Sequence, residues 1–319
     1  MSEQSKVVKS YLKKFPRGTT LGLARKLFKD YPLLFTSVES ARSVVKYYRG
    51  QHGDRSRKKV SEIIERIPIP ESDAEDWTPY IIPKNIKRLL ILNDIHVPFH
   101  DVKALEICFK YSENNIDGIL INGDLFDFYK GSRFEQNPYK RSMAQEIDMG
   151  CQLIKHMKQR FNVPIYVKYG NHCERWDKYI MLKAPELFNL DGIRLEDRIR
   201  SQVDVEIIYD KRIVKHGHLD ILHGHEFFGA PSQAVNPARG LFMKTLDSCL
   251  IGHLHKSSSH TETTLGNKMI TTHSVGCLCN LHPEYARINK WNHGFAINEI
   301  TQNGEYVLHN KRIANGKVY

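Results

Sequence analysis

Long apolar runs are absent from this sequence of 319 residues, since no stretch reaches the ~18 apolar residues that a membrane-spanning helix requires. The first residues, Met1 to Lys6, also lack the apolar segment of a secretory signal peptide. The six cysteines are scattered, and only Cys277 and Cys279 stand close together. These absences argue against a membrane-spanning or disulfide-stapled protein, and we expect a soluble, cytoplasmic chain with free thiols.

Net charge is absent from most of the chain. Residues 61–319 hold 32 Lys and Arg and 32 Asp and Glu, whereas residues 1–60 hold 15 basic residues and only four acidic ones. The whole formal charge of +11 therefore belongs to the first 60 residues. Because such a segment is attracted to phosphate-rich surfaces, we expect residues 1–60 to bind nucleic acid.

The basic segment is predicted to form a small helical domain over residues 1–60. Thr36-Ser-Val-Glu39 fits a capping box at the start of its last helix, and Arg42, Lys46 and Arg49 are expected on the outer side of that helix. This layout resembles a helix-turn-helix domain, but a protein-docking module has the same pattern, and both interpretations stay open. The helices are expected over residues 7–15, 20–29 and 36–49.

A linker is expected over residues 61–85, where Ile67-Pro-Ile-Pro70 and the charges that follow disfavour regular structure. From residue 86 to 319 the pattern changes to strands that alternate with helices, which is typical of an α/β domain. Helices are expected over residues 102–113 and 143–161, and strands over residues 88–93, 118–122, 163–168, 205–209, 219–222, 248–251, 268–272, 294–300 and 306–310.

Five polar clusters each follow one of the apolar strands. Apolar cores do not place so many acidic, amide and imidazole groups at strand ends without satisfying their polarity, and metal ions satisfy it. Together, the clusters predict one site at which metal ions bind. They are Asp94-Ile-His96, Gly123-Asp-Leu-Phe-Asp127, Gly170-Asn-His172, His223-Gly-His225 and Gly252-His-Leu-His255.

This set resembles the five signature motifs of the calcineurin-like metallophosphoesterase superfamily, over roughly residues 87–256. The resemblance implies an α/β (α+β) fold with four layers, in which two mixed β-sheets are flanked by helices, and a site for two divalent metal ions. It assigns one metal to Asp94, His96, Asp124 and His255, and the other to Asp124, Asn171, His223 and His253.

The expected chemistry follows from two cations held about 3.5–4 Å apart, which need a shared anionic ligand and can acidify a bridging water into hydroxide for in-line attack on phosphorus. Asp124 is expected to be that shared ligand. By the resemblance, His172 stabilises the transition state or protonates the leaving alkoxide, and Asp127 supports it. Imidazole and carboxylate ligands without thiolate suit Mn, Fe or Zn, and we favour Mn.

Several residues allow a second interpretation. His225 competes with His223 as the ligand, and we expect His223 because the family pattern places the ligand directly before Gly224. Asp127 is alternatively a helix N-cap. Cys173 stands where the superfamily commonly has an acid, which leaves the substrate open.

Other polar residues near the motifs carry weaker expectations. His216 and His218 are expected to face solvent, and Cys277 and Cys279 to be ordinary buried residues. The loop cations are candidates to contact a substrate phosphate, and they are Lys130, Arg133 and Arg175.

The metal motifs predict the reaction class and leave the substrate open. We expect a phosphodiesterase or nuclease whose basic domain holds nucleic acid. The alternative is a phosphomonoesterase, acting on a small molecule or a protein, with residues 1–60 as a docking module. A non-enzymatic scaffold is disfavoured because the ligand set is complete.

Overall fold

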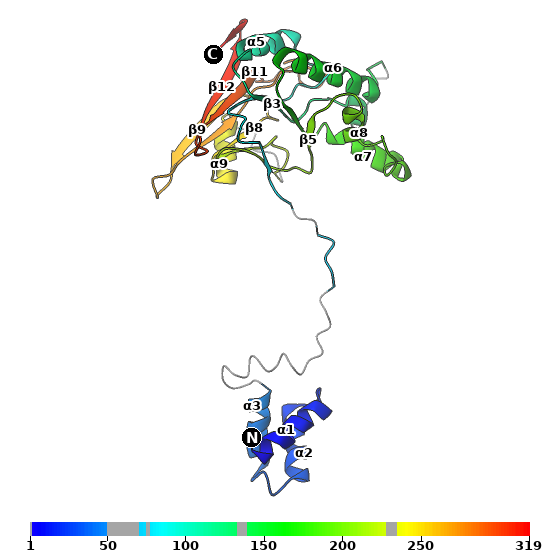
Figure 1. Ribbon diagram of the computed structural model, residues 1–319, viewed down its shortest axis with the longest axis vertical. Coiled ribbons are helices and arrows are strands. Elements are labelled where there is room, and N and C mark those ends of the chain that lie inside the picture. Colours follow the sequence, from blue (N-terminus) through cyan, green and yellow to red (C-terminus); the bar gives the residue numbers. More distant parts are fainter. Residues whose placement is uncertain (1, 50–69, 75–76, 133–138, 228–234) are drawn as a thin grey trace. The chain divides into compact units, whose positions relative to one another are not determined.

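The computed structural model describes residues 2–49, 70–74, 77–132, 139–227 and 235–319 (Figure 1). The basic stretch 55–59 and Arg133 lie outside the described residues. The chain divides into two compact units, Met1–Glu75 and Asp76–Tyr319. Strand β1 (Tyr80–Ile81), which falls inside the expected linker, pairs with β6 (Val214–His216) in the second unit, so the linker ends before the predicted residue 85.

The N-terminal unit contains helices α1 (Glu3–Lys14), α2 (Thr20–Asp30) and α3 (Val38–Tyr48). Thr19 caps α2 as expected, but α3 is capped by Ser37, whose hydroxyl accepts a hydrogen bond from the Ser40 amide, and not by Thr36. The three helices share a small core of their own, formed by Val8, Leu12, Leu23, Ala24, Leu27, Phe35, Ala41 and Val45.

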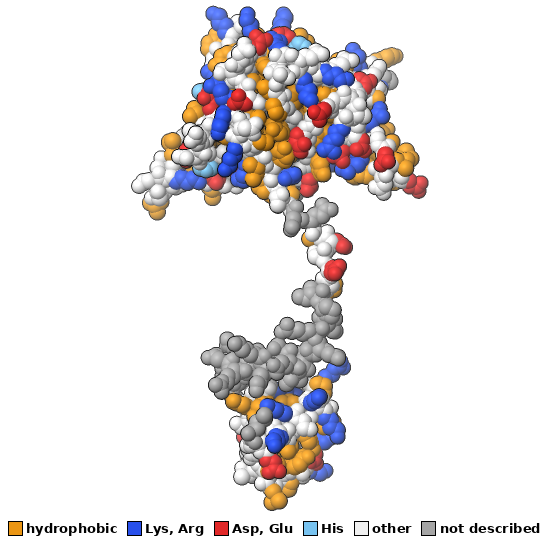
Figure 2. Space-filling view, in the orientation of Figure 1, with side chains coloured by type: hydrophobic (Ala, Val, Ile, Leu, Met, Phe, Trp, Pro, Cys, Tyr) orange, Lys and Arg blue, Asp and Glu red, His pale blue; other side chains and the backbone are white. Residues whose placement is uncertain are grey.

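The outer side of α3 is less cationic than its sequence indicates. Arg42 pairs with Glu39 at 3.3 Å, and the Arg49 guanidinium donates to the Thr20 hydroxyl and to the Gly18 carbonyl. Arg49 therefore ties α3 to the start of α2, which corrects its expected place on the outer side. Figure 2 shows several Lys and Arg side chains on the face of this unit turned toward the viewer, interspersed with hydrophobic ones.

A seven-stranded mixed sheet forms the centre of the second unit, with the order β13-β12-β11-β2-β3-β4-β5. Strands β2 to β5 run parallel, and β11 pairs antiparallel with β2. Its strands are β2 (Arg88–Leu92), β3 (Gly118–Asn122), β4 (Ile165–Lys168), β5 (Glu206–Ile208), β11 (His293–Ile300), β12 (Tyr306–Ala314) and β13 (Lys317–Val318).

A six-stranded sheet with the order β1-β6-β7-β8-β10-β9 lies against the first. Within it, β7 and β8 are parallel neighbours, as are β8 and β10. Besides β1 and β6 it contains β7 (Leu219–Ile221), β8 (Cys249–Ile251), β9 (Ser258–Thr263) and β10 (Met269–Ser274).

The layers follow from the alternation of side chains along the strands. Leu90 and Leu92 pack against helices α5 (Val102–Ser112), α6 (Met143–Phe161) and α8 (Leu195–Arg200), whereas Leu89 and Ile91 point to the other face and pack against the second sheet. On the far side, α9 (Pro237–Thr245) packs on β8. The order helices, sheet, sheet, helix is visible in Figure 1 and confirms the predicted four-layer sandwich.

His216 corrects the expectation that it faces solvent. It is buried at the end of β6, where its Nε2 lies 2.9 Å from the Ile86 carbonyl and its Nδ1 lies 2.8 Å from the Asn298 amide. Burial lowers the pKa of this imidazole, so it is neutral and structural. Among the described residues, no helix is long and apolar enough to cross a membrane.

Candidate metal centre

The structure brings all seven expected metal ligands together at one edge of the sandwich. Each lies in the loop that follows the carboxyl end of a strand. These strands are β2, β3 and β4 of the first sheet and β7 and β8 of the second. Because these strands are parallel within each sheet, their carboxyl ends point to the same edge. The ligand loops therefore converge from both sheets.

The backbone turns sharply at most of these ligands. Five of the seven adopt a left-handed conformation, with φ between 47° and 63°. Aspartate and histidine tolerate this region better than most residues, and such strain concentrates at functional sites. The turns aim the side chains inward directly after each strand. The five are Asp94, His96, Asp124, His253 and His255.

Two positions in the motifs require glycine, because a ligand from another strand lies where a Cβ atom would stand. A Cβ atom on Gly170 would lie 2.2 Å from the Asp124 Oδ1 atom and 2.6 Å from the Asp124 amide nitrogen. A Cβ atom on Gly123, whose φ is +90°, would lie 2.1 Å from the Nδ1 atom of His223. Each glycine thus leaves room for a ligand that comes from another strand.

The first group of donors consists of Asp94, His96 and His255. The Nε2 atoms of His96 and His255 are 3.3 Å apart, and His255 Nε2 is 3.2 Å from Asp94 Oδ1, which is buried and receives no hydrogen bond. Two nitrogens that bind one zinc-sized ion at about 2.0–2.1 Å in tetrahedral geometry lie ~3.3 Å apart. The observed spacing and the unsatisfied carboxylate oxygen fit a shared cation.

The second group consists of Asp124, Asn171, His223 and His253. His223 donates through Nδ1 to the Asn122 carbonyl at 2.9 Å, so its Nε2 lone pair faces Asp124 Oδ2 at 3.2 Å and Asn171 Oδ1 at 3.3 Å. Three acceptors that face one another repel unless a cation or a proton lies between them. Donor atoms of Asp124, His223 and His253 also lie within 4.8 Å of one another, as one ion requires.

The buried carboxylates of the site favour positive charge on the groups around them. Burial lowers the pKa of His223, but Asp124 and Asp94 outweigh it and raise that pKa to about 9. The pKa of His255 is likewise lowered by burial and raised by Asp94, with the same result of about 9. Burial raises the pKa of Asp94, yet His255 and His223 bring it down to about 2. Carboxylates that hold protons on two imidazoles at neutral pH would also hold metal ions, which then displace those protons.

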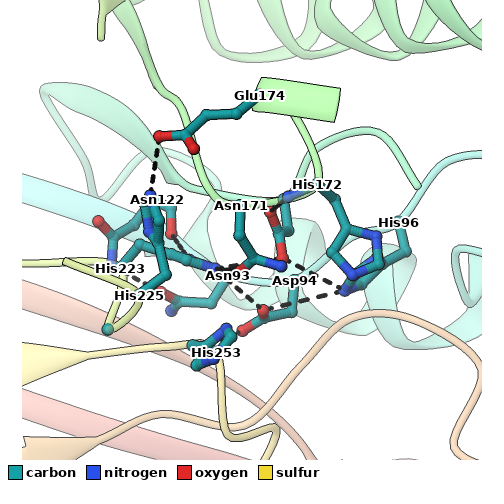
Figure 3. Close-up of polar contacts among 12 residues, drawn as sticks. Asn93, Asp94, His96, Asn122, Asn171, His172, Glu174, His223, His225 and His253 are labelled. Atoms are coloured by element: carbon teal, nitrogen blue, oxygen red, sulfur yellow. Dashed lines mark hydrogen bonds and ion pairs between the residues drawn. The ribbon is translucent and has the colours of Figure 1, made fainter. Parts of the chain in front are cut away.

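Asp127 lies between two imidazoles and not at a helix N-cap. Its Oδ1 atom is 3.1 Å from His96 Nδ1 and 3.3 Å from His172 Nδ1. Since Nδ1 of His96 faces this carboxylate, its Nε2 is left as the metal-facing atom. Figure 3 shows His96 and His172 side by side, with Asp94 between them and the His223 side of the site.

His172 is held at both ends. Its amide donates to Asp124 Oδ1 at 2.8 Å, its Nδ1 atom lies 2.8 Å from the Asp127 carbonyl, and its Nε2 atom lies 3.0 Å from the Arg175 guanidinium. Arg175 also donates to the Asp127 carbonyl at 2.9 Å. These bonds place the Nδ1 proton toward Asp127 and leave Nε2 as the acceptor.

His225 is drawn away from the donors. Its Nε2 atom lies 3.0 Å from Glu174 Oε1, a contact that Figure 3 shows above the ligand cluster. Glu174 begins helix α7 (Glu174–Lys183), and Cys173 is buried just before it. The geometry agrees with His223 as the ligand and gives Glu174 a partner outside the metal groups.

A buried ion pair contacts the backbone of the His223 loop. The sequence did not predict either of its two residues. Lys168, at the end of β4, is fully buried, and its Nζ atom lies 3.0 Å from Glu226 Oε1. Glu226 accepts hydrogen bonds from the amides of His223 at 2.8 Å and Gly224 at 2.6 Å. Burial raises the pKa of Glu226, but Lys168 and His223 lower it to about 2, so this carboxyl group is ionised at neutral pH.

Residues 87–257 match the family model of calcineurin-like phosphoesterases, which is more than half of the chain. The chain therefore belongs to the calcineurin-like phosphoesterase family and is a hydrolase that acts on phosphate ester bonds. This confirms the superfamily that the five motifs predicted.

Individual proteins are similar to the chain as well. The Gene 54 protein of Mycobacterium phage L5 is 26% identical over 236 residues, which cover 69% of this chain and 91% of that protein. Among solved structures, a single mutant of Vps29 from Entamoeba histolytica is 13% identical, with a TM-score of 0.39, over 73% of this chain and 96% of that one.

Proposed function

We propose that the chain is a metal-dependent phosphodiesterase that cleaves nucleic acid. The observation that carries this proposal is the concentration of a formal charge of +11 in residues 1–60, while residues 61–319 together carry no net charge. Phosphate contacts by Lys and Arg supply most of the affinity of non-specific nucleic-acid binding. A basic unit attached to such a domain raises the local concentration of a polyanionic substrate.

The N-terminal unit carries the cations in a suitable form. Most of its lysines and arginines extend from a rigid three-helix core into solvent, where a phosphate backbone can reach them. Its described acidic residues are few, and Asp30 and Glu39 are occupied by Tyr11 and Arg42. The exposed cations are Lys6, Lys13, Lys14, Arg17, Arg25, Lys26 and Lys29.

The chemistry of the site suits attack on phosphorus. Two divalent ions, of which Mn²⁺ suits the imidazole and carboxylate donors, would activate water and neutralise charge on the phosphoryl oxygens. Asp124 is placed to be shared, because it faces His223 at 3.2 Å and His96 at 3.9 Å. Asp127 fixes the orientation of His96 and His172 through their Nδ1 atoms.

His172 and Arg175 complete the proposed machinery. Arg175 occupies His172 Nε2 at 3.0 Å in this structure, and a substrate phosphate would draw the guanidinium toward its own oxygens. His172 Nε2 is then free to carry the proton that the leaving alkoxide takes up. The Asp127 carboxylate, 3.3 Å from Nδ1, stabilises the imidazolium that donates this proton and that becomes a neutral imidazole when the alkoxide takes the proton up.

The test compares substrates on the Mn²⁺-loaded protein. We expect faster turnover of bis-p-nitrophenyl phosphate than of p-nitrophenyl phosphate, together with cleavage of labelled single- or double-stranded DNA. Selective turnover of the monoester without cleavage of DNA would favour the alternative, a phosphomonoesterase whose basic unit docks to a protein.

The role of the basic unit is tested by charge reversal. A variant with Lys13→Glu, Arg25→Glu and Lys29→Glu should bind DNA more weakly, and its salt dependence should flatten by about one unit for each phosphate that is no longer neutralised. Three exposed lysines of the second unit provide the matched control, as Lys103→Glu, Lys110→Glu and Lys317→Glu. Equal effects of the two triple variants would show that the N-terminal cations have another partner.

A further inference from the structure

Two aromatic side chains stand beside the metal centre, and the proposed chemistry does not use them. The Trp291 ring packs against His255 with ring centroids 4.1 Å apart and an interplanar angle of 68°. Tyr285 lies next to Trp291, with ring centroids 6.2 Å apart. Tyr285 is 67% exposed, which is unusual for a large ring so close to a buried polar site.

The segment that carries these rings is held in place before any substrate arrives. The Asn289 side chain accepts a hydrogen bond from the Trp291 amide at 2.8 Å and donates to the carbonyls of Leu281 and Ala286. On the other side of the indole, the Asn292 amide donates to the His255 carbonyl at 2.9 Å. A preformed aromatic surface loses little conformational entropy when a flat ligand stacks on it.

Tyr285 is connected to the metal centre through Trp291, which packs against His255, and much of its side chain is open to solvent. Partial burial of the phenol group and the nearby carboxylates of Asp127 and Asp124 raise the pKa of Tyr285, whereas Arg175 lowers it. The neighbouring Glu284 pairs with Lys140 at 3.8 Å. The aromatic surface thus lies within the electrostatic reach of the groups that bind the phosphate.

We propose that Tyr285 and Trp291 form a stacking subsite for the nucleobase next to the scissile phosphate. This inference rests on the proposed phosphodiesterase function and names the class of diester, a nucleoside phosphate with an unstacked base. Every base has an apolar face that stacks on aromatic side chains, so the subsite selects nucleosides without selecting a sequence. The occupant is a base of a single strand or a strand end, because bases inside a duplex have both faces covered.

Two diesters with one leaving group test the subsite. Thymidine 5′-p-nitrophenyl phosphate and methyl p-nitrophenyl phosphate both release p-nitrophenolate, so the ratio of their kcat/KM values isolates the nucleoside. We expect wild type to favour the thymidine ester, and Tyr285→Ala to lower this ratio about tenfold, the size of one base–aromatic stack. Tyr285→Phe should keep the ratio. Tyr319→Ala removes a similarly exposed tyrosine at the sheet edge and should leave both rates unchanged.

A second readout does not depend on turnover. Titration with thymidine 5′-monophosphate in Mg²⁺ buffer should quench tryptophan fluorescence, and Trp291→Phe should remove the quench while Trp77→Phe keeps it. Turnover of both esters with a ratio that Tyr285→Ala does not change would overturn the subsite and leave the phosphodiesterase function standing. Failure to turn over either ester would refute the phosphodiesterase function. The fluorescence titration would then test the stacking subsite alone, and a quench that survives in Trp291→Phe would contradict the subsite.

Discussion

Replacement of Gly170 by alanine tests whether the close approach of the β4 loop to Asp124 positions the shared ligand. The added Cβ atom would meet the Asp124 Oδ1 atom at 2.2 Å and its amide nitrogen at 2.6 Å. Rotation of the side chain moves only the oxygen, so the backbones must separate by ~1 Å to restore a contact of roughly 3.5 Å. Overpacking of this kind costs about 1–3 kcal/mol of folding free energy.

Gly170→Ala should reduce the activity of the protein more than its folding stability. A misplacement of about 1 Å at a catalytic group can cost on the order of 100-fold in rate, and here the amide of His172, which donates to the same oxygen, moves as well. We expect Gly170→Ala to lower kcat/KM for bis-p-nitrophenyl phosphate about 100-fold and to weaken Mn²⁺ binding in calorimetric titration. Gly266→Ala is the matched control, because its Cβ atom would meet nothing closer than 3.9 Å. Activity and Mn²⁺ affinity of Gly170→Ala within twofold of the control would refute the reasoning.

Three further predictions follow from the site. Lys168→Met should destabilise the fold by about 3–5 kcal/mol in urea unfolding, because it leaves the buried Glu226 carboxylate without its cation; a loss under 1 kcal/mol would contradict this role. Mn²⁺ affinity should rise as the pH increases from 6.5 to about 9, because the ion displaces protons from His223 and His255. In the metal-free protein, the same raised pKa values add stability that is fully present below pH 6.5 and is lost as the pH rises through about 9. A calorimetric Mn²⁺ affinity that does not change over this pH range would exclude the mechanism. Chelation should lower the melting temperature of the phosphoesterase unit, since saturation at 100 times Kd contributes about 2.7 kcal/mol, and should leave the separate N-terminal core unaffected in calorimetry; equal shifts in both units would argue against a metal site confined to the second.

The parts of the molecule that the sequence predicted are those with local signals. Strand β3 at residues 118–122 and helix α6 at residues 143–161 coincide with their expected ranges, because apolar periodicity and a capping serine mark them. The ligand motifs were recognisable because each places acidic, amide or imidazole residues within a few positions of a strand end. Their convergence then follows from parallel strands that share an edge.

The parts that the sequence did not predict depend on contacts between distant residues. Lys168 and Glu226 are ordinary as single charges, and only the fold brings them together inside the core. His216 lies in a polar stretch, yet β6 carries it inward against Asn298. Helix α7 was missed because none of its residues is fully buried, and Trp176 packs against the core while only partly buried. Trp291 gains its significance from its packing against His255.

The most direct test of the metal centre is the turnover of bis-p-nitrophenyl phosphate by Mn²⁺-loaded wild type and by Asp124→Asn, with the fold of both checked by circular dichroism. Asp124 is the carboxylate that we propose as the shared ligand, because its Oδ2 atom lies 3.2 Å from His223 and 3.9 Å from His96, so its loss should lower Mn²⁺-dependent turnover by at least about 1,000-fold. A folded Asp124→Asn protein that retains Mn²⁺-dependent turnover within tenfold of wild type would contradict the assignment of the metal centre.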